Sequence, residues 1–194
     1  MAGPPRGGVA AVVLAAGAGS RFAAADRTHK LLAPWRGRPV IAAVLDAATE
    51  AGIGAVWVVT GAADLDEVIG GCGARRVPNP RWAEGQATSL AAAVDLAGAE
   101  GLARIVVGLG DQPLVPSSAW RAVAAAGGPI AVATYGGRRA NPVGLGEEVW
   151  PLLPRTGDAG ARVVIRNCPE LVEEVACDGN PVDIDTVEDL RLWS

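Results

Sequence analysis

Short apolar stretches alternate with amphipathic, alanine-rich stretches along most of this chain. Runs rich in Val, Ile and Leu predict strands, and apolar residues recurring every three or four positions predict helices. The predicted strands are 9–15, 55–60, 74–77, 104–109 and 130–134, and the predicted helices are 39–51, 64–69, 88–96 and 116–126. Strands that alternate with helices predict an α/β fold with a mostly parallel sheet, joined by right-handed crossovers. In such sheets, ligands bind at the carboxyl ends of the strands.

The pattern loosens after residue 135. Strands are predicted at 172–176 and 181–185. The segment 157–162 is predicted to open a helix that runs to about residue 167, and a last helix is predicted at 186–193. Thr186 is the expected N-cap of that last helix, with Asp189 at its third position. Residues 1–8 are expected to form a loose tail, and 9–194 a single domain.

Composition excludes several classes of protein. A net charge of −4 argues against a general nucleic-acid or membrane-surface binder. The three cysteines are widely separated, which disfavours a zinc or redox motif and predicts reduced thiols in the cytoplasm. A catalytic triad is improbable because His29 is the only histidine. The N-terminus lacks a signal-peptide core, and the apolar run after it is too short for a membrane span.

The first predicted strand runs into a glycine-rich turn that is followed by two cations, Arg21 and Lys30. Backbone N–H groups of such a turn can approach phosphate oxygens, and the cations offset their charge. The candidate nucleotide-binding residues here are Leu14, Ala15, Ala16, Gly17, Gly19, Ser20, Arg21 and Lys30. Phe22 replaces the third glycine of the dinucleotide fingerprint, and no Walker loop occurs. A tight turn without any ligand is the open alternative.

Carboxylates lie where a metal could meet that phosphate site. Asp111 follows the predicted strand 104–109, and Asp183 and Asp185 share one face of the predicted strand 181–185. Two like charges on one face favour a cation nearby, and Mg²⁺ prefers carboxylate and phosphate oxygens. The alternatives are a turn or N-cap role for Asp111 and a solvated edge strand for the pair, with Asp185 as a cap. If the strands are neighbours, one Mg²⁺ ion could join all three, with Arg21, Lys30 and Asp111 as catalytic residues.

A third polar segment precedes the predicted helix 88–96. Gly85, Gln86 and Ser89 are candidates for reading a base edge or holding a phosphate. The alternative is that Thr88 or Ser89 only caps the helix.

Five motifs occur in one order: Leu14–Phe22 with Lys30-Leu31-Leu32, Gly110-Asp111-Gln112-Pro113, Asn141-Pro142-Val143, Gly157–Arg162 and Asp183–Thr186. Together they resemble the molybdenum cofactor nucleotidyltransferases, over nearly the whole chain. The resemblance implies a three-layer α/β/α, Rossmann-like fold of the glycosyltransferase-A type. The implied activity is transfer of a nucleoside monophosphate from an NTP to a phosphorylated small molecule, with Mg²⁺ and release of pyrophosphate.

The loop sequence Leu14-Ala15-Ala16-Gly17 is most similar to the branch that uses CTP and molybdopterin. The guanylyl branch carries a second glycine where this chain has Ala16, so the Ala16 methyl group could decide which base fits. The resemblance also implies an acceptor site with Arg139, Asn141 and Arg162, and delivery of the product to a molybdoenzyme or its chaperone. Residues 23–29 lengthen the loop relative to the family. The alternatives are GTP as donor, another acceptor (a phosphorylated sugar, polyol or phospholactate), or a non-catalytic nucleotide-binding relative.

Overall fold

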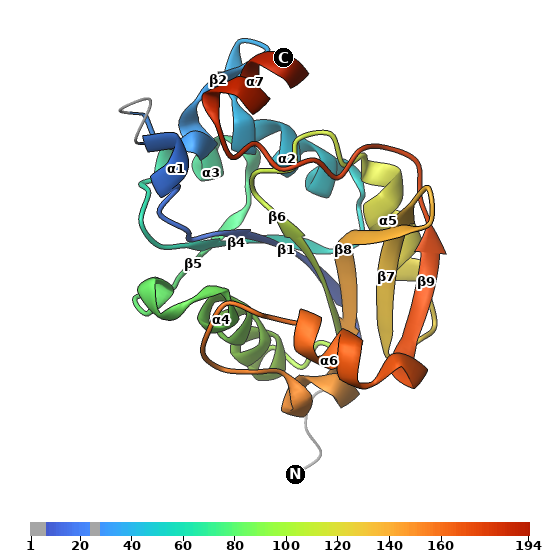
Figure 1. Ribbon diagram of the computed structural model, residues 1–194. Coiled ribbons are helices and arrows are strands. Elements are labelled where there is room, and N and C mark those ends of the chain that lie inside the picture. The colour runs from blue at the N-terminus through green and yellow to red at the C-terminus, as the bar shows by residue number, and fades with distance from the viewer. Residues whose placement is uncertain (1–6, 24–27) are drawn as a thin grey trace.

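The computed structural model describes residues 7–23 and 28–194, in which a central sheet lies between two layers of helices (Figure 1). Helices α2, α3 and α5 cover one face of the sheet, and α4 and α6 cover the other (Figure 1).

The strands are β1 (Val9–Ala15), β2 (Pro34–Trp35), β3 (Arg38–Pro39), β4 (Ala55–Thr60), β5 (Arg75–Pro78), β6 (Arg104–Leu109), β7 (Ile130–Tyr135), β8 (Arg138–Gly146) and β9 (Val172–Ala176). The α-helices are α1 (Ser20–Ala23), α2 (Val40–Glu50), α3 (Asp66–Cys72), α4 (Gln86–Ala99), α5 (Ser117–Ala125), α6 (Arg162–Asn167) and α7 (Val187–Trp193), and the short 3₁₀ helices are η1 (Lys30–Leu32), η2 (Trp82–Glu84), η3 (Glu147–Leu152) and η4 (Pro169–Leu171).

The seven-stranded sheet has the order β5-β4-β1-β6-β8-β7-β9. β1 pairs in parallel with β4 and β6, while β8 pairs antiparallel with both β6 and β7. β8 reverses direction because Gly136 and Gly137, both with positive φ, form a two-residue hairpin turn after β7. The prediction of a mostly parallel α/β sheet is therefore confirmed, with β8 as the antiparallel exception.

Alternate side chains of β1 build the core on both faces of the sheet. Ala11 and Val13 pack into the cluster on the α2 side, and Val12 and Leu14 pack into the cluster on the α4 side. Burial on both faces explains why the strand sequence is continuously apolar rather than alternating. The strand ends where this apolar sequence ends, at Ala15. The glycine loop that follows therefore lies at the carboxyl edge of the sheet.

The segment 181–185 was predicted to be a strand, and this prediction is wrong. The segment crosses above the carboxyl edge of the sheet on its way to α7 instead of lying beside another strand (Figure 1). One backbone hydrogen bond, from Ile184 N to Asp111 O at 2.9 Å, joins it to the end of β6. Ile184 is fully buried beside Phe22 and Trp35, so the expected alternation survives without a strand. The two carboxylates of this segment therefore come to the end of β6.

Helix α7 has the predicted N-terminal cap. Thr186 Oγ1 accepts from Asp189 N at 3.1 Å, and the Asp189 carboxylate accepts from Thr186 N at 2.8 Å. This reciprocal arrangement satisfies donors at the helix start and fixes the backbone next to Asp185. At the other end of α7, Trp35 Nε1 donates to Trp193 O at 2.9 Å, which ties α7 to the small β2–β3 hairpin.

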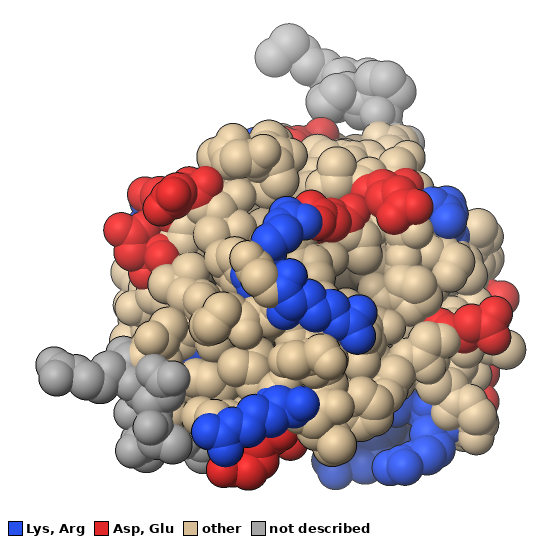
Figure 2. Space-filling model, turned by 90° about the horizontal axis from the view of Figure 1, so that it is seen from above, with Lys and Arg blue, Asp and Glu red and all other residues tan. Residues whose placement is uncertain are grey.

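Basic and acidic side chains are interspersed among uncharged residues on the face seen from above in Figure 2. Among its described residues, this face shows no continuous basic surface of the kind that tracks a nucleic-acid backbone. Within residues 7–23 and 28–194, no helix has both the length and the apolar character needed to cross a bilayer.

Candidate active site

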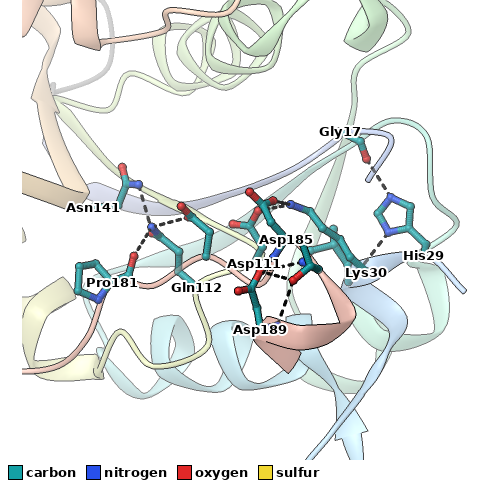
Figure 3. A network of polar contacts seen from close by, with 12 residues as sticks. Gly17, His29, Lys30, Asp111, Gln112, Asn141, Pro181, Asp185 and Asp189 are labelled. Carbon is teal, nitrogen blue, oxygen red and sulfur yellow. Dashed lines mark hydrogen bonds and ion pairs between the residues drawn. The ribbon is translucent and has the colours of Figure 1, made fainter. Parts of the chain in front are cut away.

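Three segments distant in sequence meet around the ammonium group of Lys30 (Figure 3). Lys30 begins η1, Asp111 follows β6, and Asp185 precedes α7. Lys30 Nζ lies 2.5 Å from Asp111 Oδ2 and 2.7 Å from Asp185 Oδ1. The side chains of Lys30, Asp111 and Asp185 are only 14%, 16% and 27% exposed, so water screens these charges weakly.

These contacts set the protonation of the lysine. Burial acts to lower the pKa of Lys30, but the charges and hydrogen bonds of Asp111 and Asp185 outweigh it and raise that pKa above its ordinary value. Lys30 therefore stays cationic at neutral pH. The sequence-based prediction placed Lys30 on the triphosphate. In the structure, its charge is held by the carboxylates that were expected to bind the metal.

A second polar network continues from Asp111 toward β8. Gln112 is buried, and its Nε2 donates to Asp183 Oδ1 and to Pro181 O, both at 2.9 Å. Its Oε1 accepts from Asn141 Nδ2 at 3.2 Å (Figure 3). The pKa of Asp183 is raised, mainly because burial removes its hydration and secondly because Asp111 is negatively charged. Gln112 thus links the turn after β6, the segment before α7 and the strand β8.

The predicted metal ligands are brought together, but they do not form a complete metal site. Asp111 Oδ1 is buried and accepts no hydrogen bond from any described residue. Such an orphaned oxygen costs free energy unless it gains a partner, and a hard divalent cation fits it. Across the described ranges, no group of three His, Cys, Asp or Glu residues is arranged to hold a metal. Binding of Mg²⁺ by Asp111, Asp183 and Asp185 stays a prediction, and Asp111 is the ligand that the structure favours most.

A cavity of about 460 Å³ opens beside this cluster at the carboxyl edge of the sheet. Most of the predicted nucleotide-binding residues line it: Leu14, Ala15, Ala16, Gly17, Gly19, Lys30, Gly85, Gln86, Ser89 and Asp111. Ser20 is not among the described residues that line this cavity. The backbone of Arg21 lies in α1, but its side chain is outside the described part of the structure, so the prediction for Arg21 stays open.

The alternative of a simple helix cap at Thr88 or Ser89 is wrong. Helix α4 begins at Gln86 with Gly85 as its N-cap, so both hydroxyl residues lie inside the first turns. The Thr88 hydroxyl donates to Gly85 O at 2.8 Å, and Asn79 Nδ2 donates to Ser89 Oγ at 3.0 Å. These bonds hold the start of α4 and place Gln86 in the cavity wall.

Trp82 and Asp158 also line the cavity, although neither was predicted as a site residue. Trp82 lies in η2, after the turn Pro78-Asn79-Pro80, and it is only partly buried. A tryptophan in a loop of a chain with 4% aromatic residues was the signal that could have identified it. Asp158 comes from the loop 157–160, which was recognised as a motif but not placed in the nucleotide site.

The candidate acceptor residues separate into two places. Asn141 and Arg162 line a small cavity of about 50 Å³, which shares Leu14, Gln86 and Leu109 with the 460 Å³ cavity. Arg139 lies elsewhere: its Nε pairs with Glu174 Oε1 at 2.7 Å, and it lines a different hollow, beside Cys177. Asn141 and Arg162 therefore lie next to the cavity of the glycine loop, and Arg139 does not.

We expect Trp82→Ala to weaken nucleotide binding about tenfold. Trp82 lines the 460 Å³ cavity, and an indole ring there would offer a stacking surface to a bound base, which contributes on the order of 1–3 kcal/mol per base. Isothermal titration with CTP measures the change. Trp82→Phe retains an aromatic surface and should restore most of the affinity, and unchanged binding by Trp82→Ala would exclude stacking on this residue.

Comparison with known proteins shows which family the chain belongs to. The sequence profile of the MobA-like NTP transferase domain matches residues 11–175. Nicotine blue oxidoreductase of Paenarthrobacter nicotinovorans is 32% identical over 203 residues, covering 94% of this chain and 94% of the relative. A nucleotidyl transferase from Methanothermobacter thermautotroptrophicus has a TM-score of 0.80 at 28% identity, with 95% of each chain covered.

A further similar structure is Rv0371c from Mycobacterium tuberculosis, with a TM-score of 0.79 at 29% identity and coverage of 97% of this chain and 98% of that one. A second structure of Rv0371c is a complex with manganese. The profile match spans most of the chain, and the solved relatives share the whole fold. The chain therefore belongs to the family of MobA-like NTP transferase domains.

Proposed function

We propose that this protein transfers CMP from CTP to the phosphate of molybdopterin in a Mg²⁺-dependent reaction that releases pyrophosphate. The observation that carries the proposal is the common wall of two cavities at the carboxyl edge of the sheet. Leu14, Gln86 and Leu109 line both the larger cavity of the glycine loop and the smaller cavity of Asn141 and Arg162. A donor nucleotide and a phosphorylated acceptor bound there would meet beside Lys30 and Asp111.

The bond changes need no covalent enzyme intermediate. An oxygen of the acceptor phosphate attacks the α-phosphorus of CTP, a new P–O bond forms, and the bond to the oxygen that bridges to the β-phosphorus breaks. Pyrophosphate leaves with that bonding electron pair. Since the attacking oxygen is already anionic, positioning and charge stabilisation supply most of the rate.

Residues of this chain have separate tasks in that reaction. Gly17 and Gly19 line the larger cavity, where backbone N–H groups of this loop would bind the triphosphate and Lys30 would offset the charge that develops on pyrophosphate. Arg162 and Asn141 orient the acceptor phosphate. Asp111, with Asp183 and Asp185, would hold Mg²⁺, which supplies charge neutralisation at the α-phosphate when bound. The manganese complex of Rv0371c supports the binding of a divalent cation.

The preference for CTP rests on Ala16. Ala16 is one of the residues that line the larger cavity, and its carbonyl oxygen accepts from Ala62 N at 3.1 Å, which holds the loop in place. We expect Ala16→Gly to reduce the CTP-over-GTP preference about tenfold, because one methyl group in a shaped pocket is worth roughly 1–3 kcal/mol. Relative kcat/KM values for the two nucleotides measure this. Ala18→Gly, in the same loop and lining the same cavity, is the matched control and should leave the preference unchanged.

The activity itself is tested with CTP and GTP labelled at the α-phosphate, each incubated with Mg²⁺ and molybdopterin. Labelled CMP joined to the pterin, with one pyrophosphate released per transfer, is the expected result. Transfer of GMP alone would refute the base assignment. Transfer only to a phosphorylated sugar, polyol or phospholactate would refute the acceptor. Absence of transfer with every pair would leave a non-catalytic nucleotide-binding protein.

The name of the 32%-identical relative favours one second candidate, a redox reaction. An oxidoreductase would need a reduced nicotinamide or flavin cofactor, and it would release no pyrophosphate. Phe22, which stands where the dinucleotide fingerprint requires glycine, is fully buried and favours the transferase. Reduction of nicotine blue at the expense of such a cofactor, without any use of NTP, would establish the redox candidate instead.

A further inference from the structure

Lys30 is the only lysine in the chain, in which Lys and Arg together number 17. All other residues of this Lys and Arg set are arginine. Its ammonium group lies between two carboxylates that come from different segments, Asp111 and Asp185, with short contacts to both. A compact, positively charged group between hard oxygen ligands occupies the kind of position that a divalent cation takes.

We propose that Lys30 is an internal substitute for the metal ion, which holds the two carboxylates until nucleotide phosphates draw its ammonium group away. The nucleotide-free protein then binds divalent metal weakly, and metal and nucleotide bind with positive cooperativity. The nucleotide half of this inference rests on the proposed function. The metal half concerns the nucleotide-free protein alone.

Charge and burial carry the argument. The three side chains are mostly buried, so a metal ion entering between the carboxylates must displace the ammonium group or share their charge with it. The carboxylate oxygen Asp111 Oδ1 stays buried and accepts no hydrogen bond from the described residues, so Lys30 fills the site only in part. Lys30 also lines the nucleotide cavity, which gives its flexible stem a second set of anionic partners within reach.

The choice of lysine over arginine fits this exchange. A guanidinium group binds carboxylates through a rigid, two-pronged geometry, whereas an ammonium group is a point charge on a flexible four-carbon stem. The ammonium group can therefore turn from carboxylates to phosphates without rebuilding the site. By linkage, any factor by which nucleotide strengthens metal binding equals the factor by which metal strengthens nucleotide binding.

The first test measures Mn²⁺ binding to nucleotide-free protein by electron paramagnetic resonance. We expect Lys30→Met to bind Mn²⁺ about tenfold more tightly than wild type, because the carboxylates lose their competing cation. Mn²⁺ should also raise the Tm of this variant more than that of wild type. Arg38→Met is the charge-matched control: it removes one positive charge from the exposed Arg38–Asp46 pair and should leave Mn²⁺ affinity unchanged. Equal Mn²⁺ affinity in wild type and a folded Lys30→Met would overturn the proposal.

The second test uses wild type alone, so it does not depend on how the variant folds. Lysine labelled with ¹³C at the ε-carbon gives one side-chain NMR signal, since the chain has one lysine. CTP without metal should shift this signal, and Mn²⁺ should broaden it at a lower concentration with CTP than without. Equal broadening with and without CTP would overturn the cooperativity.

The two tests separate the inference from the proposed function. If CMP transfer occurs but Lys30→Met and wild type bind Mn²⁺ equally, only the inference fails. If no nucleotide binds but Lys30→Met still gains Mn²⁺ affinity, the proposed function fails and the role of Lys30 as a metal substitute stands.

Discussion

Replacing Asp111 by Asn is expected to reduce CMP transfer about a thousandfold while the protein stays folded. Asp111 Oδ2 contacts Lys30, and the buried Oδ1 accepts no hydrogen bond from the described residues. The neutral amide removes the charge that would hold the metal at the α-phosphate, and such charge stabilisation is worth several kcal/mol of the barrier. The backbone contact from Ile184 N to Asp111 O does not involve the side chain, so the local fold should persist.

Initial rates of pyrophosphate release at saturating CTP and acceptor measure the loss, and circular dichroism checks the fold. Asp95→Asn is the matched control, because Asp95 forms an exposed ion pair with Arg155 and lies in α4. An exposed pair of this kind contributes at most about 1 kcal/mol, so this variant should transfer CMP at the wild-type rate. If Asp111→Asn retained most of the activity, the metal and the reaction would have to be placed elsewhere.

The sequence predicted the bounds of β1 well for a physical reason. A strand buried on both faces must be apolar throughout, so its end is marked sharply where the first glycine appears. The same reasoning located β4 and β6, and with them the edge of the sheet that carries Asp111. Local capping chemistry was equally readable, since Thr186 and Asp189 satisfy each other within one helical turn.

Contacts between segments that are distant in the chain could not be predicted from the local sequence pattern. The alternation of residues predicted that the side chains of Asp183 and Asp185 share one face and that Ile184 lies on the opposite face. It did not predict that the segment crosses the edge of the sheet without pairing as a strand. The partners of Lys30 depend on where η1, β6 and α7 meet. A sequence pattern shows residue types and spacing, whereas this meeting is set by the packing of Ile184 against Phe22 and Trp35.

The contacts of Gln112 also could not be predicted from the sequence. A glutamine after a buried strand suggests either solvent or a ligand, and the sequence offers no means to choose. In the structure it is buried because three partners from two other segments satisfy its amide group: Asp183, Pro181 and Asn141. Its burial is therefore a property of the assembled site, which local propensity does not encode.

Gly85→Ala is expected to weaken CTP binding about a hundredfold. Gly85 has φ of +106°, and a Cβ atom there would lie 2.4 Å from the backbone of Gly157 and 2.7 Å from Asp158 Oδ1. The loop at Gly157 is clamped in place, because Gly157 N donates to Glu84 O at 3.0 Å and Gly157 O accepts from Ala87 N at 2.9 Å. The methyl group would break this clamp and move the cavity wall, and misplacement by about 1 Å can cost a hundredfold in function.

Calorimetric titration with CTP and thermal unfolding together separate this effect from general damage. A strained left-handed residue costs about 1–3 kcal/mol, so some loss of stability should accompany the loss of binding. Gly70→Ala is the matched control: Gly70 lies inside α3 with no atom within 4 Å of the added Cβ, and should gain about 0.5–1 kcal/mol from helix propensity with CTP affinity unchanged. Wild-type CTP affinity in a Gly85→Ala protein would mean that the nucleotide does not need the loop at Gly157. That result would refute the role that we predict for Gly85, which is to allow the loop at Gly157 to approach the start of α4 and so shape the cavity wall.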